Sequence, residues 1–156
     1  MKRRLLLLGL TLLGACASRP PAPAHERLWS GRLALSLQGD SPQQWHALFE
    51  LQGSAQAGEL RLFSPVGSLL ARLSWTPEQA LLERGQERQS AATVEDLMRR
   101  LAGTPMPVDA LFDWLQGRPV PRGSWQPDLS ALAQGRINAR RSQPEAPALL
   151  RIVLDQ

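Results

Sequence analysis

The sequence has few of the residues that build most catalytic and metal sites. Its 156 residues include one cysteine and two histidines. A single cysteine excludes an internal disulfide, and no spacing of His, Cys and Asp resembles a metal site. The sequence also lacks a G-x-S-x-G nucleophile motif and a glycine-rich loop for phosphate. We therefore expect no catalytic residue, no metal ion and no cofactor, and we do not expect an enzyme.

Clustered positive charge is missing as well. The chain has 18 Lys and Arg against 14 Asp and Glu, but three of the positive residues lie at positions 2–4. Without the first 15 residues, 15 arginines face 14 acidic residues, and the net charge falls to about +1. These arginines are scattered along the chain, which argues against nucleic acid as a partner.

The first 16 residues combine three features in a fixed order. Residues 2–4 are positive, residues 5–13 are mostly leucine, and small residues at 14 and 15 precede Cys16. This order is typical of a secretory signal peptide, and the apolar run is too short to span a bilayer as a stop-transfer helix. We predict that residues 1–15 are a lipoprotein signal peptide and that Cys16 carries S-diacylglycerol and N-palmitoyl groups.

An ordinary secretory signal beside an incidental cysteine is the alternative. A lone cysteine in an exported chain would then be a free thiol in an oxidising compartment, which favours lipidation. Two or three acyl chains anchor a protein stably, because each buried methylene contributes about 0.8 kcal/mol. Ala17 follows the cysteine instead of Asp, and by the sorting rule of enterobacteria-like lipoproteins this favours the outer membrane. Residues 16–28 are short, polar and proline-rich and predict a flexible tether.

Residues 29–156 are expected to form one folded domain. From 29 to 85 apolar and polar residues alternate, so that Leu33, Leu35 and Leu37 share one strand face. Turn signals recur roughly every ten residues, which indicates an antiparallel meander rather than βαβ units. Residues 118–135 are expected to be a loop. Two further strands are expected near the end of the chain, one with a weak pattern at 136–140 and one with a clear pattern at 150–154.

Two short helices are predicted after residue 92. Thr93 has the sequence context of an N-cap, and apolar residues follow at helical spacing up to Gly103. A second apolar stripe runs over 108–115, with Asp109 and Asp113 on its solvated side. Helices of this length are not stable alone, so we expect both to lay apolar stripes on the concave face of the sheet.

Two interpretations of that concave face stay open on the pattern alone. The apolar residues could form a dry core with the helices, which is the simpler interpretation, or an incompletely covered cavity for an apolar ligand. The candidates for lining a cavity are Leu33, Leu35, Leu37, Trp45, Phe49, Leu62, Leu73, Leu97, Met98, Leu111 and Leu115.

Two segments resemble one known family. R-L-F-S-P-V-G-S at 61–68 is followed by L-M-R-R-L-A-G-T-P-M-P-V-D-A-L-F-D-W-L-Q-G-R-P at 97–119. A helix, then G-x-P-x-P, then a helix with L-x-x-W-L-x-G-x-P resembles the inner helices of LolB, the outer-membrane lipoprotein receptor family. The opening strand S-G-R-L-A-L agrees with this resemblance, which extends from about residue 29 to the end.

The resemblance implies a mainly β (α+β) fold, an unclosed antiparallel half-barrel with two or three short helices on its concave face. It implies a monomer anchored by lipid to the periplasmic side of the outer membrane. Such a protein accepts lipoproteins from the soluble carrier LolA and inserts them into the inner leaflet, using no nucleotide or metal. The cavity interpretation is then preferred, with acyl chains of the cargo as ligand.

The resemblance also implies a membrane-contact loop at Pro65, Val66 and Gly67. Val66 stands where the family usually has leucine, and valine buries less area, so a weaker contact with the phospholipid is expected. Compared with the family, residues 20–27 leave little room for a first helix and the chain stops soon after Leu154, so we expect either a more open cavity or a shortened relative with weaker activity. A structural or assembly lipoprotein that uses the same fold as a scaffold remains the alternative function.

Overall fold

One antiparallel sheet of nine strands runs through the whole described part of the chain. The structure is a computed structural model that describes residues 27–142 and 144–156. The predicted signal peptide, Cys16 and nearly all of the predicted tether lie outside these residues. In chain order the elements are β1 (Trp29–Leu37), β2 (Gln43–Gly53), β3 (Gly58–Phe63), β4 (Leu69–Trp75), β5 (Ala80–Arg84), β6 (Glu87–Ala91), α1 (Val94–Ala102), α2 (Val108–Leu115), β7 (Trp125–Asp128), the 3-10 turn η1 (Leu132–Gln134), β8 (Arg136–Arg141) and β9 (Ala148–Leu154).

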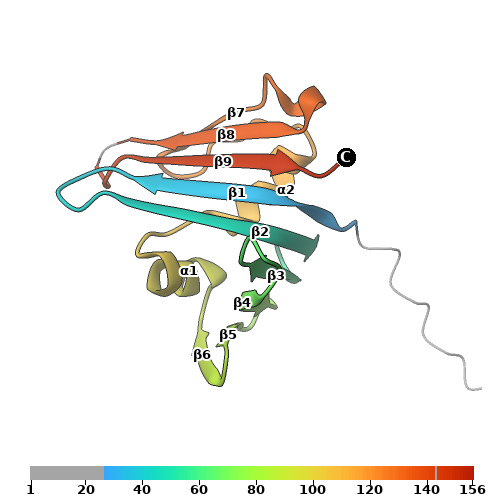
Figure 1. The fold of residues 1–156 in the computed structure, drawn as a ribbon, viewed down its shortest axis with the longest axis vertical. Coiled ribbons are helices and arrows are strands. Elements are labelled where there is room, and N and C mark those ends of the chain that lie inside the picture. Colours follow the sequence, from blue (N-terminus) through green and yellow to red (C-terminus); the bar gives the residue numbers. More distant parts are fainter. Residues whose placement is uncertain (1–26, 143) are drawn as a thin grey trace, which may run out of the picture.

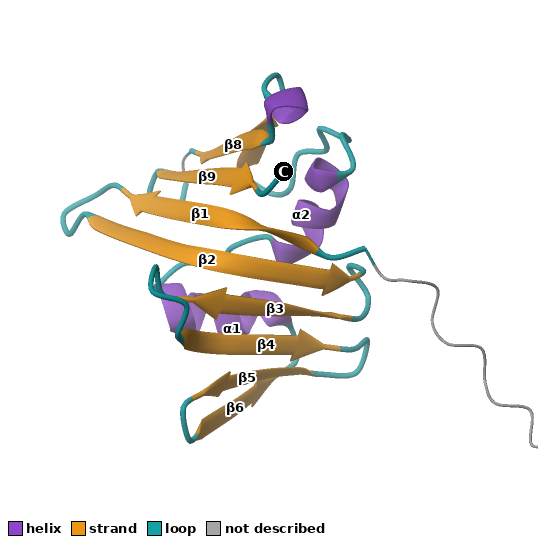
Figure 2. Ribbon diagram, turned by 45° about the vertical axis from the view of Figure 1, so that its right-hand side comes forward, coloured by secondary structure: helices purple, strands orange, loops and turns teal. Residues whose placement is uncertain are grey.

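The sheet curves around two helices without closing. Its strand order is β6-β5-β4-β3-β2-β1-β9-β8-β7, so β6 and β7 are free edges at opposite ends. Both helices lie on the same face, with α1 over β4, β5 and β6 and α2 behind β1 (Figure 1; Figure 2). The predicted unclosed half-barrel with helices on its concave face is therefore confirmed.

Strand alternation separates an apolar concave face from a charged convex one. Leu33, Leu35 and their counterparts on neighbouring strands are buried under the helices. On the convex face Arg61 pairs with Glu50 at 2.5 Å and Arg72 pairs with Glu59 at 2.5 Å. A shift of one residue would exchange the two faces, so the alternation fixes the register of the strands.

The ends of α1 are set by local chemistry, as the sequence predicted. The backbone N–H of Asp96 donates to the Thr93 hydroxyl at 3.2 Å, and that hydroxyl donates to the Asp96 carboxylate at 2.8 Å. Gly103 ends the helix with φ +71°, a conformation that glycine adopts at little cost. Leu97 and Met98 are buried, whereas Arg99 and Arg100 are exposed in the last turn.

Helix α2 buries more of its surface than the single apolar stripe predicted from the sequence. Six of its eight residues are buried, and only Asp109 and Asp113 are not. Phe112 stacks edge-on against Trp29 of β1 at 5.7 Å and against Trp75 of β4 at 6.2 Å between ring centroids. The helix is therefore a plug inside the half-barrel, because three aromatic rings from separate elements meet at one point.

Two strands of the sheet were not predicted. β6 reads E-R-Q-S-A and has no apolar alternation, because it is an edge strand held by main-chain pairing with β5. β7 lies within the predicted loop and contains Pro127, which is tolerated at an edge since no further strand needs its N–H. Neither helix in the described ranges is long and apolar enough to cross a membrane.

Replacing Thr93 by alanine should lower the free energy of unfolding by about 1 kcal/mol, because α1 loses its N-cap acceptor. The same change should raise the pKa of Asp96, which the Thr93 hydroxyl and then Arg99 hold below its usual value. Urea denaturation and an NMR titration measure the two effects. Thr93→Ser keeps the hydroxyl and should change neither quantity; equal effects of Ser and Ala would contradict the capping role.

Candidate functional site

A cavity of about 250 Å³ lies between α1 and the sheet. Its walls come from β1 to β5, from the second half of α1 and from the linker between the two helices. The residues that line it are Leu33, Leu35, Trp45, His46, Ala47, Leu62, Leu70, Ala71, Arg84, Met98, Leu101, Ala102 and Met106. Almost all are apolar, so the cavity suits a hydrocarbon ligand rather than a polar one.

The cavity is open to solvent at one side. Trp45 and Leu70 keep 45% and 46% of their surface exposed although they line it. His46 and Arg84 are also exposed and supply the polar groups at the rim. A large exposed tryptophan and leucine at the mouth of an apolar cavity indicate an entrance for a ligand, since single domains rarely leave such surface uncovered.

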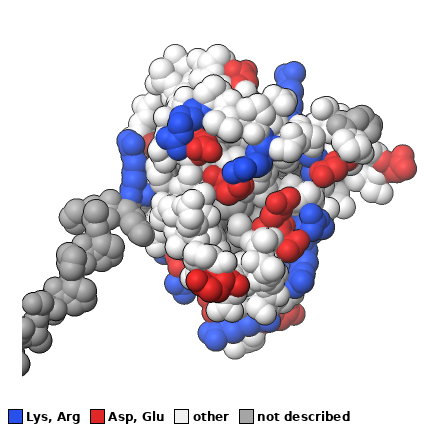
Figure 3. All heavy atoms as spheres, turned by 180° about the vertical axis from the view of Figure 1, so that it is seen from behind, with Lys and Arg blue, Asp and Glu red and all other residues white. Residues whose placement is uncertain are grey.

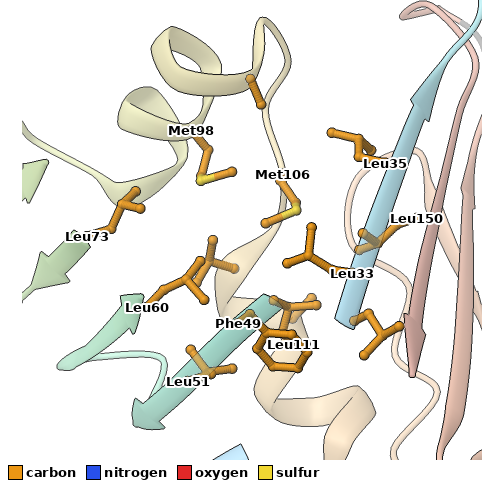
Figure 4. Close-up of a cluster of buried hydrophobic side chains, with 14 of the residues drawn as sticks. Leu33, Leu35, Phe49, Leu51, Leu60, Leu73, Met98, Met106, Leu111 and Leu150 are labelled. Atoms are coloured by element: carbon orange, nitrogen blue, oxygen red, sulfur yellow. The ribbon is translucent and has the colours of Figure 1, made fainter. Parts of the chain in front are cut away.

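Two methionines line the inner end of this cavity. Met98 comes from α1 and Met106 from the linker, and both are almost completely buried. Figure 4 shows their side chains pointing into the space between α1 and β1, with Met106 directed toward Leu33. Methionine is flexible and adapts to irregular neighbours, so this wall can reshape around a ligand.

The candidates named from the sequence divide between the cavity and the core. Leu33, Leu35, Trp45, Leu62 and Met98 line the cavity. The rest lie elsewhere: Phe49, Leu73, Leu97, Leu111 and Leu115 are buried in the core, and Leu37 is partly buried against it.

Some lining residues were missed because their position depends on local irregularities. Strict alternation places Leu70 on the outer face, but the register shifts between Leu62 and Phe63, and Leu70 lines the cavity instead. The shift also leaves Leu69, expected on the inner face, 55% exposed. Met106 stands between two prolines, where no periodicity exists to reveal its burial. Leu101 belonged to the predicted apolar stripe and could have been named.

The predicted membrane-contact loop is a tight turn between β3 and β4. The N–H of Gly67 donates to the Ser64 carbonyl and the N–H of Ser64 to the Ser68 carbonyl, both at 2.8 Å. Gly67 has φ +86°, which the turn requires. Val66 is 89% exposed at the tip. The loop therefore holds an apolar side chain away from the protein.

A buried arginine fixes the linker between the helices. Arg141 of β8 is 4% exposed, and its guanidinium donates to the Ala146 carbonyl at 2.6 and 3.0 Å. It also donates to the Thr104 hydroxyl in the linker and stacks on Trp125 with 5.4 Å to the ring centroid. Burial lowers the pKa of Arg141, against the opposing charge of Glu145. The linker is thus attached to the far half of the sheet.

The motif L-x-x-W-L-x-G-x-P at residues 111–119 has a structural role. Trp114 is fully buried, and its indole N–H donates to the Val120 carbonyl at 2.8 Å. Asp113 pairs with Arg118 and Asp109 pairs with Arg122, each at 2.6 Å. These contacts fold the chain back over the end of α2. The two aspartates lie on the solvated side, as predicted, and take part in surface ion pairs.

Neither sign of charge gathers into a large patch on the face opposite to the view of Figure 1. On the face seen in Figure 3, basic and acidic side chains alternate with uncharged surface between them. The described residues contain no group of three or more His, Cys, Asp or Glu side chains placed to hold a metal ion.

Comparison with known proteins matches this architecture to one family. Residues 27–146 match the family described as outer membrane lipoprotein LolB. A protein named outer-membrane lipoprotein LolB from Bordetella petrii is 35% identical over 80% of this chain and 66% of its own length. The protein of the same name from Chromobacterium violaceum is 34% identical over 78% of this chain and 71% of its own length. The one from Bordetella pertussis is 34% identical over 97% of this chain and 83% of its own length.

The chain belongs to the outer-membrane lipoprotein LolB family. It spans about two thirds of the length of the Bordetella petrii relative. The family is one of lipid-anchored outer-membrane proteins of Gram-negative bacteria, and this chain is one of them. The resemblance seen in residues 61–68 and 97–119 is confirmed, since both segments lie inside the matched range.

Replacing Arg141 by glutamine should lower the free energy of unfolding by about 3 kcal/mol, because the buried Thr104 hydroxyl and the Ala146 carbonyl lose their donor. Chemical denaturation measures the change. Arg140→Gln is the matched control, since Arg140 is the exposed neighbour on the same strand, and it should change stability by less than about 0.5 kcal/mol. Similar losses for both variants would show that Arg141 does not hold the linker in place.

Proposed function

We propose that this protein accepts lipoproteins from the periplasmic carrier LolA and inserts them into the inner leaflet of the outer membrane. The observation that carries the proposal is the open apolar cavity lined by Trp45, Leu70, Met98 and Met106. It offers dispersion and hydrophobic contacts without a fixed polar partner, which suits acyl chains of differing length.

Transfer of the lipidated cargo requires no catalytic step. A lipidated cargo moves toward whichever environment buries its acyl chains best, at roughly 0.8 kcal/mol for each methylene. The cavity must bury them better than the carrier does and less well than the bilayer. The exposed rim at Trp45 and Leu70 leaves part of the ligand in contact with water. The cavity therefore buries acyl chains less completely than the bilayer does.

The cavity must also widen to receive a full set of acyl chains. Its volume of about 250 Å³ is below the roughly 300–1,000 Å³ of typical ligand sites. α1 packs mainly on β4, β5 and β6, whereas six of the eight residues of α2 are buried. We therefore assign the movement to α1, which carries Met98, Leu101 and Ala102 away from the sheet while α2 stays in place.

The anchor follows from the sequence prediction. Residues 1–15 act as signal peptide, Cys16 bears the acyl groups, and residues 16–28 are the tether of the domain formed by residues 29–156. The anchor keeps the cavity at the destination membrane, because several acyl chains prevent release into water.

The loop at 64–68 is assigned to contact with the bilayer. Val66 is 89% exposed at its tip. The turn hydrogen bonds already hold Val66 in this position, so the loop does not have to rearrange when it meets the bilayer. The adjoining Leu69 and Leu70 are also exposed. Cargo leaving the cavity beside Leu70 would meet the membrane at this loop.

A fluorescent fatty acid should bind saturably to the chain from residue 17 onward, which contains every residue of the described core. Leu101→Trp fills the cavity and should weaken binding at least several-fold, because less free volume remains for the acyl chain. Arg100→Trp adds the same ring to the exposed side of α1 and should leave the affinity unchanged. Absence of saturable binding would favour the scaffold alternative over lipid transfer.

Replacing Val66 by glutamate should spare uptake of a lipidated cargo but slow its delivery to phospholipid vesicles roughly tenfold or more, since a charge at the tip opposes insertion. Fluorescence transfer assays separate the two steps. Val120→Glu, at another exposed valine, is the control and should deliver normally. Equal loss of uptake and delivery in Val66→Glu would show that the loop has a different role.

A further inference from the structure

β2 continues beyond its neighbour β3 at the end next to the cavity. β2 pairs with β1 from Gln43 onward, but with β3 only from Leu48 onward. The first five residues of β2 therefore pair on one side with β1, and on their other side no strand of the described residues lies beside them. Figure 2 shows β2 running past the end of β3 there.

The hydrogen bonds of β1 show which main-chain groups face that side. Asp155 donates its N–H to the Ser30 carbonyl, and Gln38 donates to the Pro147 carbonyl. Even-numbered residues of β1 thus turn toward β9, and odd-numbered ones toward β2. Because Leu35 lies opposite Trp45, odd-numbered residues of β2 face β1 and even-numbered ones face β3.

Gln44 and His46 are therefore the residues whose main chain faces the missing strand. Within the described ranges, neither residue has a main-chain hydrogen bond outside the strand ladder with β1. Both are exposed. Each presents a free N–H and a free C=O, which together form a short open edge.

A proline ends the pairing at this point. Leu48 lies opposite Phe63, so a continued ladder would place Pro65 opposite His46. Proline has no N–H to donate, and the chain turns away through the Ser64–Ser68 hydrogen bond. The free edge is thus a consequence of Pro65 and not of a frayed strand end.

The open edge runs along the mouth of the cavity. Trp45, His46 and Ala47 of β2 line the cavity together with Leu62 of β3 and Leu70 of β4. Pro65 and His46 also border a second hollow on the convex side of the sheet. An extended chain that leaves the cavity past the exposed Trp45 and His46 would run beside this edge.

We propose that the polypeptide following the lipidated cysteine of the cargo pairs as a short extra strand with Gln44 and His46. This inference rests on the proposed function, because the acyl chains must occupy the cavity for the attached peptide to emerge at its mouth. The pairing uses main-chain groups on both partners, and strand addition of this kind binds extended segments largely independently of sequence. It would let one receptor accept cargo proteins with unrelated N-terminal sequences.

Two synthetic lipopeptides test the pairing on the chain from residue 17 onward. Both carry the same N-acyl-S-diacylglyceryl cysteine followed by the same five residues, but in one the peptide amides are N-methylated. The unmodified lipopeptide should bind roughly tenfold more tightly, because N-methylation removes the donors that reach β2. Amide hydrogen exchange at Gln44 and His46 should slow with the unmodified lipopeptide only.

A substitution on β2 provides the complementary test. His46→Pro removes the free N–H and the rim imidazole, and should bind both lipopeptides equally. His46→Ala removes only the imidazole and keeps the N–H, so it should still prefer the unmodified lipopeptide over the N-methylated one, whatever its absolute affinity. The ladder with β1 does not use this N–H, so the fold should tolerate proline at the edge.

The outcomes separate this inference from the proposed function. Equal affinity for both lipopeptides, with unchanged exchange at His46, would overturn the strand pairing while leaving acyl binding in place. If neither lipopeptide bound, the acyl cavity itself would be contradicted. Should His46→Pro fail to fold, the comparison of the two lipopeptides on the unmodified protein still decides the question.

Discussion

The concave face of the nine-stranded sheet carries more apolar surface than two helices of nine and eight residues can cover. The rest of the structure follows from this mismatch. α2 buries itself where Phe112 meets Trp29 and Trp75, and α1 covers part of the remaining face. Between α1 and β1 a cavity stays open, with Trp45 exposed at its rim. An uncovered apolar surface of this kind is stable in a monomer only if it is limited in area, and it is then available to a ligand.

More contacts fix α2 in place than fix α1. This difference suits a binding site that must open. Trp114 and Phe112 fix α2 through an indole hydrogen bond to the Val120 carbonyl and two edge-on ring contacts. Arg141 attaches the linker to the far half of the sheet. Among the described residues α1 makes no comparable buried polar contact, and its buried face includes the adaptable Met98. Movement confined to α1 would widen the cavity without disturbing the core.

Regular features of this fold were predictable from sequence, and irregular ones were not. The alternation around Leu33 and Leu35, the Thr93 cap and the Gly103 stop depend on neighbours in the chain, so the strands and α1 followed from the pattern. The β3–β4 register shift that turns Leu70 inward and the placement of Met106 depend on contacts distant in sequence, so the cavity wall was only partly anticipated. The edge strand β6 carries no apolar alternation, because main-chain pairing with β5 sets its position.

Occupation of the cavity by acyl chains is the central claim, and the methionines allow it to be measured directly. Met98 and Met106 are the two methionines of the sequence after residue 15, and both line the cavity. With ¹³C-methyl methionine, an NMR titration with a diacylglyceryl lipopeptide should shift both methyl signals and give NOEs between them and acyl methylene protons. Saturable binding of the lipopeptide with both methyl signals unmoved would contradict the account.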